Sequence, residues 1–181
     1  MFIDLLRRRR SIRAFQNRPV EREKIDLLRE AVLRAPSSRG IKPWGFVFVT
    51  DPQTLARLSE AKPHGAAFMA KAPLAVVVFA DPGKSDVWVE DASIAALIVH
   101  LAATDLGLGS CWIQIRKRYR DESKSAGRYV ADLLGIPAAM EVEAVVAVGY
   151  AAEEKMPHPV GSLDTDKVNF EYYGRQEAKI G

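Results

Sequence analysis

Arginine side chains gather in a five-residue stretch near the N-terminus, where Ser11 lies among Arg9, Arg10 and Arg13. A guanidinium group pairs bidentately with phosphate oxygens and a serine hydroxyl adds a neutral donor, so the stretch has the donor chemistry of a phosphate site. The pattern of residues 2–10 predicts a short helix, which would place Arg9 and Arg13 one turn apart on one surface. The alternative is that these cations only complement the dipole of the helix end.

Several other chemistries lack the residues that they need. The histidines His64, His100 and His158 are scattered, and neither H-x-x-x-H nor C-x-x-C occurs, so no metal site is expected. No G-x-S-x-G elbow is present, which argues against a hydrolase of that type. Residues 107–112 lack the last glycine of a dinucleotide-binding fingerprint and follow a helical pattern where a strand is required. We expect Cys111 to be a buried strand residue without catalytic function.

Composition is typical of one globular domain, with 181 residues, 48% hydrophobic and 27% charged. The longest apolar run, Leu74 to Ala80, is too short to cross a bilayer, and the N-terminus lacks the apolar stretch of a secretory signal. The sequence therefore predicts a cytoplasmic protein with no membrane partner. A nucleic-acid-binding protein is an alternative that would use residues 7–10 and 116–118, but no recognition module is present, so no nucleic-acid partner is expected.

Apolar patterns predict the elements that must position these groups, in one α+β domain with four or five strands. Strands are expected over residues 46–49, 74–79, 111–115 and 142–148, and helices over residues 21–34, 51–61, 65–71, 87–106 and 125–134. The strand at 74–79 is apolar on both faces, so it should be central and covered by helices on each side.

The long helix at 87–106 carries an apolar stripe on an otherwise small-residue surface: Ile94, Leu97, Ile98 and Leu101. Small residues permit close helix approach, either in a core or across a dimer axis. The single domain spans residues 1–181, and its last part, 151–181, changes composition and ends in an aromatic-rich extension. We expect this extension to pack on the body or on a second subunit, because apolar rings are costly to leave in solvent.

Four segments resemble the successive signatures of the nitroreductase family, in the order and spacing of that family: residues 9–15, residues 35–38 with Pro43-Trp44, residues 107–113 and residues 146–150. Residues 166–174 are similar to the C-terminal ending of some members. The resemblance implies a three-layer α/β/α sandwich with a mostly antiparallel central sheet, assembled as an intertwined homodimer. It implies an oxidoreductase that uses FMN, with NADH or NADPH as co-substrate.

The resemblance also implies which residues contact the flavin. The phosphate would be held by Arg9, Arg10, Ser11 and Arg13. The segment from the partner subunit that touches the flavin ring would be Pro36, Ser37 and Ser38, and the backbone amides near flavin N5 would come from Trp112, Ile113 and Gln114. The flavin would perform the chemistry, passing electrons from NAD(P)H to a small organic acceptor by a ping-pong route, so no catalytic side chain is expected. Lys42 and Lys71 are candidates to stabilise negative charge on the flavin.

Two departures from the family pattern affect the expected cofactor site. Where the family usually has N-x-Q-P-W, this chain has Gly40-Ile41-Lys42-Pro43-Trp44, so Gly40 and Lys42 would stand at cofactor-contacting positions. Where members often carry K-x-R, it has His158-Pro159-Val160, and His158 or Lys155 would assist the N-terminal arginines. These departures leave a second hypothesis open, a flavin-binding dimer with a storage or sensing role and little turnover.

Overall fold

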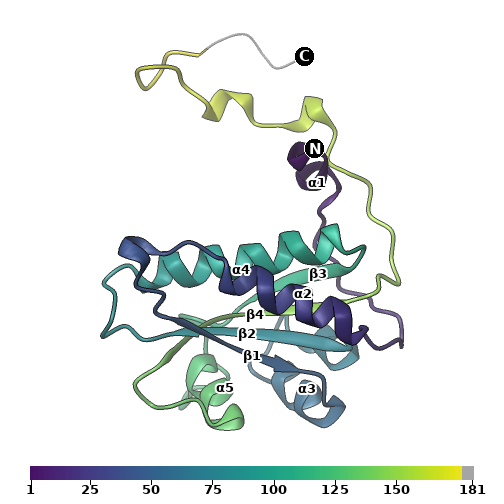
Figure 1. Ribbon diagram of the computed structural model, residues 1–181, viewed down its shortest axis with the longest axis vertical. Helices are drawn as coiled ribbons and strands as arrows, with labels where there is room; N and C mark the ends of the chain where they lie inside the picture. Colours follow the sequence, from purple (N-terminus) through teal and green to yellow (C-terminus); the bar gives the residue numbers. More distant parts are fainter. Residues whose placement is uncertain (177–181) are drawn as a thin grey trace.

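Four antiparallel strands form one sheet in the computed structural model, which describes residues 1–176 (Figure 1). The strands are β1 (Trp44–Val49), β2 (Leu74–Ala80), β3 (Gly109–Gln114) and β4 (Glu141–Gly149), in the spatial order β1-β2-β4-β3. Helices cover both faces of this sheet, so the α+β class and the three-layer sandwich expected from the sequence are confirmed.

The two central strands are β2 and β4, and both are apolar on each face. Every residue of β2 is buried except Phe79, and every residue of β4 is buried except Glu141. Alternate side chains point to opposite faces of a strand. Ala75 and Val77 accordingly pack in the core on one side, whereas Val76 and Val78 pack in the core on the other. The prediction of a central strand covered on both sides is confirmed.

One helical layer consists of α2 (Arg22–Leu33) and α4 (Trp88–Asp105), and the opposite layer contains α3 (Pro52–Ser59) and α5 (Ala126–Leu134) (Figure 1). Local signals begin and end these helices. The Asp51 side chain accepts a hydrogen bond from the Thr54 backbone N–H at 2.8 Å to cap α3, and the Ser125 hydroxyl caps α5. The predicted helix at 65–71 is a shorter 3-10 turn, Ala67–Lys71.

The apolar stripe of α4 does not face the sheet. The α4 side chains that pack in the core against the sheet are Val99 and three alanines, Ala92, Ala96 and Ala103. Ile94 and Leu97 remain 39% and 47% exposed. The outer surface of α4 therefore carries apolar side chains that the core of this chain does not cover.

The N-terminal helix α1 (Phe2–Arg8) ends before the arginine-rich stretch. Residues 9–13 are extended, because Ser11 pairs with Ser110 in a parallel bridge and the Ile12 N–H donates to the Ser110 carbonyl at 2.9 Å. The expectation that Arg9 and Arg13 lie one helical turn apart is therefore wrong.

The C-terminal extension leaves the body after β4 and continues past α1, away from the sheet (Figure 1). It contains exposed apolar side chains, among them Leu163, Phe170 and Tyr173. Its first residues, 151–155, pair with residues 11–15 of the body. Residues 156–176 are largely exposed, so packing of this part on a second subunit stays a prediction. The last five residues of the expected extension, 177–181, lie outside the described residues.

Candidate functional site

The arginine segment, residues 9–13, is fixed by the start of the C-terminal extension. The backbone N–H groups of Arg13 and Ala14 donate to Glu153 Oε1 at 2.5 and 3.2 Å. Lys155 Nζ donates to the Ser11 carbonyl at 2.7 Å and pairs with Glu153 at 3.2 Å. These backbone donors hold the pKa of the Glu153 carboxyl below its usual value. The Glu153 carboxylate is thus engaged by main-chain donors and Lys155.

The guanidinium groups of this segment retain donors for a ligand. Within residues 1–176, the Arg10 and Arg13 side chains make no ion pair, and Arg13 is exposed. Lys155 adds a further cation at Ser11, where the sequence analysis had named it as an assistant. A cluster of cations and a hydroxyl, with its nearest carboxylate already paired, suits a phosphate dianion. The donor set therefore fits the phosphate group that the sequence analysis assigned to it.

Arg9 is oriented by a buried histidine on α4. Its Nη1 donates to His100 Nε2 at 2.9 Å, and His100 Nδ1 contacts the hydroxyl of Ser110. Burial, and secondarily the charge of Arg9, lower the pKa of His100 to about 4. The imidazole is consequently neutral near pH 7.

The outer edge of β3, which pairs with the arginine segment at Ser110, extends beyond that segment. The Ser110 carbonyl points to this edge, because it accepts from Ile12. In an antiparallel strand the N–H and C=O of one residue point the same way and residues alternate, so the N–H groups of Trp112 and Gln114 also point outward. The strand thus offers main-chain donors beside the arginines, while Ile113 packs in the core.

A buried carboxylate lies behind the end of this edge. Glu143 on β4 is 4% exposed, and Ser93 on α4 donates to its Oε1 at 3.4 Å. Among residues 1–176 its Oε2 finds no hydrogen-bond partner, although Arg116 Nε lies 3.9 Å from that atom. Burial raises the pKa of Glu143. Sequence reasoning had not identified this residue.

The loop that follows α2 contains the second group of expected site residues, from Pro36 to Lys42. The Ser38 N–H donates to Asp91 Oδ1 at 2.8 Å, and the Lys42 N–H donates to the Ser37 hydroxyl at 2.8 Å. Gly40 and Lys42 both adopt positive φ, at 68° and 53°. The buried carboxylate of Asp91 therefore ties this loop to the first turn of α4.

The two groups of site residues do not meet within one chain. The loop contacts Asp91 and the arginine segment contacts His100, nine residues further along α4, a rise of about 14 Å. His158 is exposed, and within the described chain it makes no hydrogen bond to the arginines, whereas Lys155 contacts the segment. Lys71 lines a separate cleft of about 480 Å³ together with Arg18.

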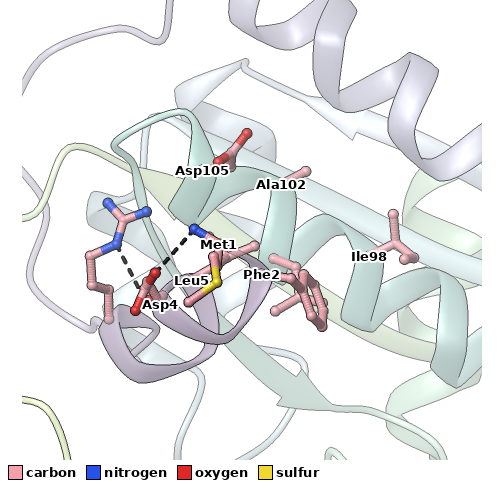
Figure 2. A pocket seen from close by; sticks show the side chains of 9 residues that line it. Met1, Phe2, Asp4, Leu5, Ile98, Ala102 and Asp105 are labelled. Carbon is pink, nitrogen blue, oxygen red and sulfur yellow. Dashed lines mark hydrogen bonds and ion pairs between the residues drawn. The ribbon is translucent and has the colours of Figure 1, made fainter.

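A pocket of about 570 Å³ lies between α1 and α4, beside the arginine segment. Figure 2 shows Phe2 and Leu5 of α1 across from Ile98 and Ala102 of α4. Phe2 is 65% exposed. An apolar pocket open to solvent at this position continues the exposed stripe of α4.

Neither a metal centre nor a membrane span is evident in the part of the chain that the structure describes. No group of three or more His, Cys, Asp or Glu side chains in residues 1–176 is arranged to hold a metal ion. No helix of these residues combines the length and the apolar character needed to cross a bilayer.

Besides Glu143, three residues that shape the site were not identified from the sequence: His100, Ser110 and Glu153. Each acts through contact with a segment about 90 to 140 positions away. Local patterns carry no signal for such contacts.

Comparisons with known proteins agree with one family. The Nitroreductase family model matches residues 6–63 and 60–150. A protein of Archaeoglobus fulgidus assigned as an NADH dehydrogenase/NAD(P)H nitroreductase is 40% identical over 151 residues, 81% of this chain and 83% of the relative. A relative from Methanothermobacter thermautotrophicus with the same assignment is 33% identical over 172 residues, covering 93% and 86% of the two chains.

Among solved structures, an FMN-dependent nitroreductase from Clostridium difficile R20291 superposes with a TM-score of 0.93. It is 44% identical to this chain and the match covers 94% of this chain and 99% of that one.

Proposed function

Because this chain belongs to the nitroreductase family, we propose that it is an FMN-dependent NAD(P)H oxidoreductase that passes electrons to a small organic acceptor such as a nitroaromatic or a quinone. The FMN dependence of the Clostridium difficile structure and the NAD(P)H in the names of the archaeal relatives support this assignment. The observation that carries it in this chain is the arginine segment, fixed along β3 with its cationic donors available. We also propose a cytoplasmic location, which is consistent with the family.

The residues of this chain have distinct tasks in that reaction. Arg9, Arg10 and Arg13, with the hydroxyl of Ser11, bind the phosphate of FMN. The main-chain N–H groups of Trp112 and Gln114, on the outer edge of β3, orient the ring system. When bound, FMN supplies hydride acceptance from NAD(P)H and electron delivery to the second substrate. The protein therefore contributes binding, orientation and exclusion of water, without a nucleophilic side chain.

We further propose that the working molecule is a homodimer in which each site uses two chains. The loop from Pro36 to Lys42 and the arginine segment lie toward opposite ends of α4, so a loop of the partner completes the site of each protomer. Exposed apolar side chains on α1 and on the outer face of α4 support a second copy as the occupant. The exposed part of the extension, residues 156–176, packs on that copy.

The phosphate assignment predicts that Arg9→Ala combined with Arg13→Ala yields a folded protein that purifies without flavin, because two of the three arginines assigned to the phosphate are removed. The visible absorption spectrum of the purified variant, with circular dichroism for the fold, measures this outcome. Arg22→Ala combined with Arg29→Ala is a matched control, because those arginines pair with Asp26 on the exposed side of α2. Stoichiometric flavin in the Arg9/Arg13 variant would contradict the assignment.

A measurement of catalytic turnover distinguishes the proposed enzyme from a flavin-binding dimer with a storage or sensing role. The altered residues Gly40 and Lys42 are the observation that keeps that alternative in view. We expect steady-state NAD(P)H oxidation with a quinone or nitroaromatic acceptor to give parallel lines in double-reciprocal plots, as a ping-pong route requires. Tight flavin binding with negligible acceptor reduction would favour the alternative.

A further inference from the structure

The deepest polar contact of the site lies behind Arg9, where the imidazole of His100 is 6% exposed and bonded at both of its ring nitrogens. A guanidinium group has N–H donors only and cannot accept a hydrogen bond. His100 Nε2, which receives the Arg9 donor at 2.9 Å, must therefore be the unprotonated nitrogen of the ring. The proton is consequently on Nδ1.

The partner at Nδ1 is consistent with this tautomer. The Ser110 hydroxyl donates its own proton toward the His100 carbonyl at 3.4 Å, which leaves a lone pair on its oxygen to accept from Nδ1–H. Ser110 is itself 1% exposed and belongs to β3, which also pairs with the arginine segment. Hydrogen bonds thus connect Ser110 to His100 and His100 to Arg9, from the core to the site.

This arrangement leaves Arg9 able to bind an anion. A guanidinium group has five N–H donors, and one of them is used by His100. The others suffice for bidentate pairing with phosphate oxygens. Because a side chain as long as arginine loses much rotamer freedom on binding, an anchored guanidinium binds at lower entropic cost than a free one.

We propose that His100 is a positioning residue for the cofactor phosphate: its neutral Nδ1–H tautomer holds the Arg9 guanidinium so that the remaining donors of Arg9 face the FMN phosphate. This inference rests on the proposed function and adds to it a residue outside the family signatures quoted above. Within the described chain, Arg9 is the charged group in contact with the ring, while Arg8 and Asp105 line the neighbouring pocket between α1 and α4.

Two polar substitutions separate the two contacts of the ring. In His100→Gln the side-chain amide reaches the position of Nε2, where its oxygen accepts from Arg9. In His100→Asn the shorter amide reaches only the position of Nδ1, so the contact with Ser110 is kept and the contact with Arg9 is lost. The measurement is the dissociation constant of the flavin-free full-length protein for FMN and for riboflavin, which lacks the phosphate, by quenching of flavin fluorescence.

We expect His100→Asn to weaken FMN binding by about 10-fold, the size of one charge-assisted hydrogen bond, with riboflavin binding changed less than about twofold. His100→Gln should keep most of the FMN affinity. In an Arg9→Ala background, His100→Asn should have no further effect on FMN, because both substitutions remove the same interaction.

Equal losses for FMN and riboflavin, equal behaviour of the Asn and Gln variants, or additivity with Arg9→Ala would overturn the proposal and assign His100 a purely structural role. Failure of the proposed function gives a different result: wild-type protein that binds neither flavin would overturn both. A wild type that binds FMN normally while the Asn variant keeps the wild-type ratio of FMN to riboflavin affinity would overturn only the role of His100.

Discussion

The free-energy cost of an individual polar side chain in this protein depends on how deeply it is buried. The His100 imidazole, the Glu143 carboxyl and the Asp91 carboxylate are all nearly inaccessible to solvent. Asp91 receives the Ser38 N–H and the hydroxyl of Ser85, whereas Glu143 keeps one oxygen without a hydrogen-bond partner in the described chain. A buried polar group without partners costs free energy, so Glu143 is the more expensive of the two carboxyl groups to maintain.

The depressed pKa of His100, about 4 against an ordinary value near 6.5, makes stability depend on pH. Between these values the unfolded chain binds a proton that the folded protein does not, so the free energy of unfolding falls as pH drops from 6.5 toward 4. Above pH 6.5 both states are neutral at this residue and it has no effect. From pH 7 to pH 5 the wild type should lose about 2 kcal/mol more than His100→Gln, which has no titrating group there.

Urea denaturation of both proteins at pH 7 and pH 5 measures this difference. The carboxyl groups elsewhere in the molecule are common to both proteins and cancel in the comparison. Identical pH dependence in the two proteins would show that the ring of His100 is not held neutral by the fold.

At the scale of elements, the contact between β3 and the arginine segment depends on Gly109, which has no side chain. A Cβ at Gly109 would lie 2.9 Å from the Cβ and both γ carbons of Ile12, closer than real Cβ atoms approach. Ile12 is only 7% exposed, so its side chain is packed on most sides. The glycine thus permits the close approach that places the arginines beside β3.

Gly109→Ala should therefore displace the arginine segment. We expect a loss of about 1–3 kcal/mol in the free energy of unfolding, typical of overpacking, together with weaker FMN binding. Chemical denaturation and flavin titration measure the two effects. Gly161→Ala is the matched control, because a Cβ there meets nothing within 4 Å. Unchanged stability and affinity in Gly109→Ala would mean that the segment binds FMN without close contact with β3.

Elements with strong internal patterns could be predicted from the sequence, and those set by distant contacts could not. The apolar run of β2 and the periodicity of α4 identified both elements nearly to their ends, because each pattern follows from local geometry. The conformation of residues 9–13 was predicted wrongly, because their pairing with Ser110 involves a strand about 100 residues away. His100 had been counted only as a scattered histidine for the same reason. The arginine and serine donors of the site could be identified from the sequence, but the residues that hold them in place could not.

At the scale of the whole molecule, apolar surface is distributed unevenly. One face of α4 packs small side chains on the sheet, while Ile94 and Leu97 point outward and Phe2 and Ile3 of α1 are exposed nearby. Large exposed apolar patches mark interaction surfaces in most proteins. The same helix supports the arginines at one end and the loop from Pro36 to Lys42 at the other, so assembly and cofactor binding should depend on each other.

Leu97→Lys should therefore weaken the proposed homodimer and lower the flavin content of the purified protein, because a charge would be placed on the apolar outer face of α4. Sedimentation velocity gives the mass, and absorption gives the flavin content. Gln53→Lys on exposed α3, in the opposite helical layer, adds the same charge as a control. A Leu97→Lys protein that remains dimeric with full flavin would place the interface elsewhere.

The attachment of the arginine segment to residues near Glu153 also has a consequence for the order of folding. The hydrogen bonds from Arg13 to Glu153 and from Lys155 to Ser11 join residues 140 and 144 positions apart. Closing loops of this length is entropically costly and slow, and such contacts form after local structure. During synthesis, the arginines leave the ribosome well before their supports on β3 and beyond β4. The arginine segment, which is made before its supports, thus acquires its binding geometry late, and the flavin should bind late in folding without serving as an early nucleus.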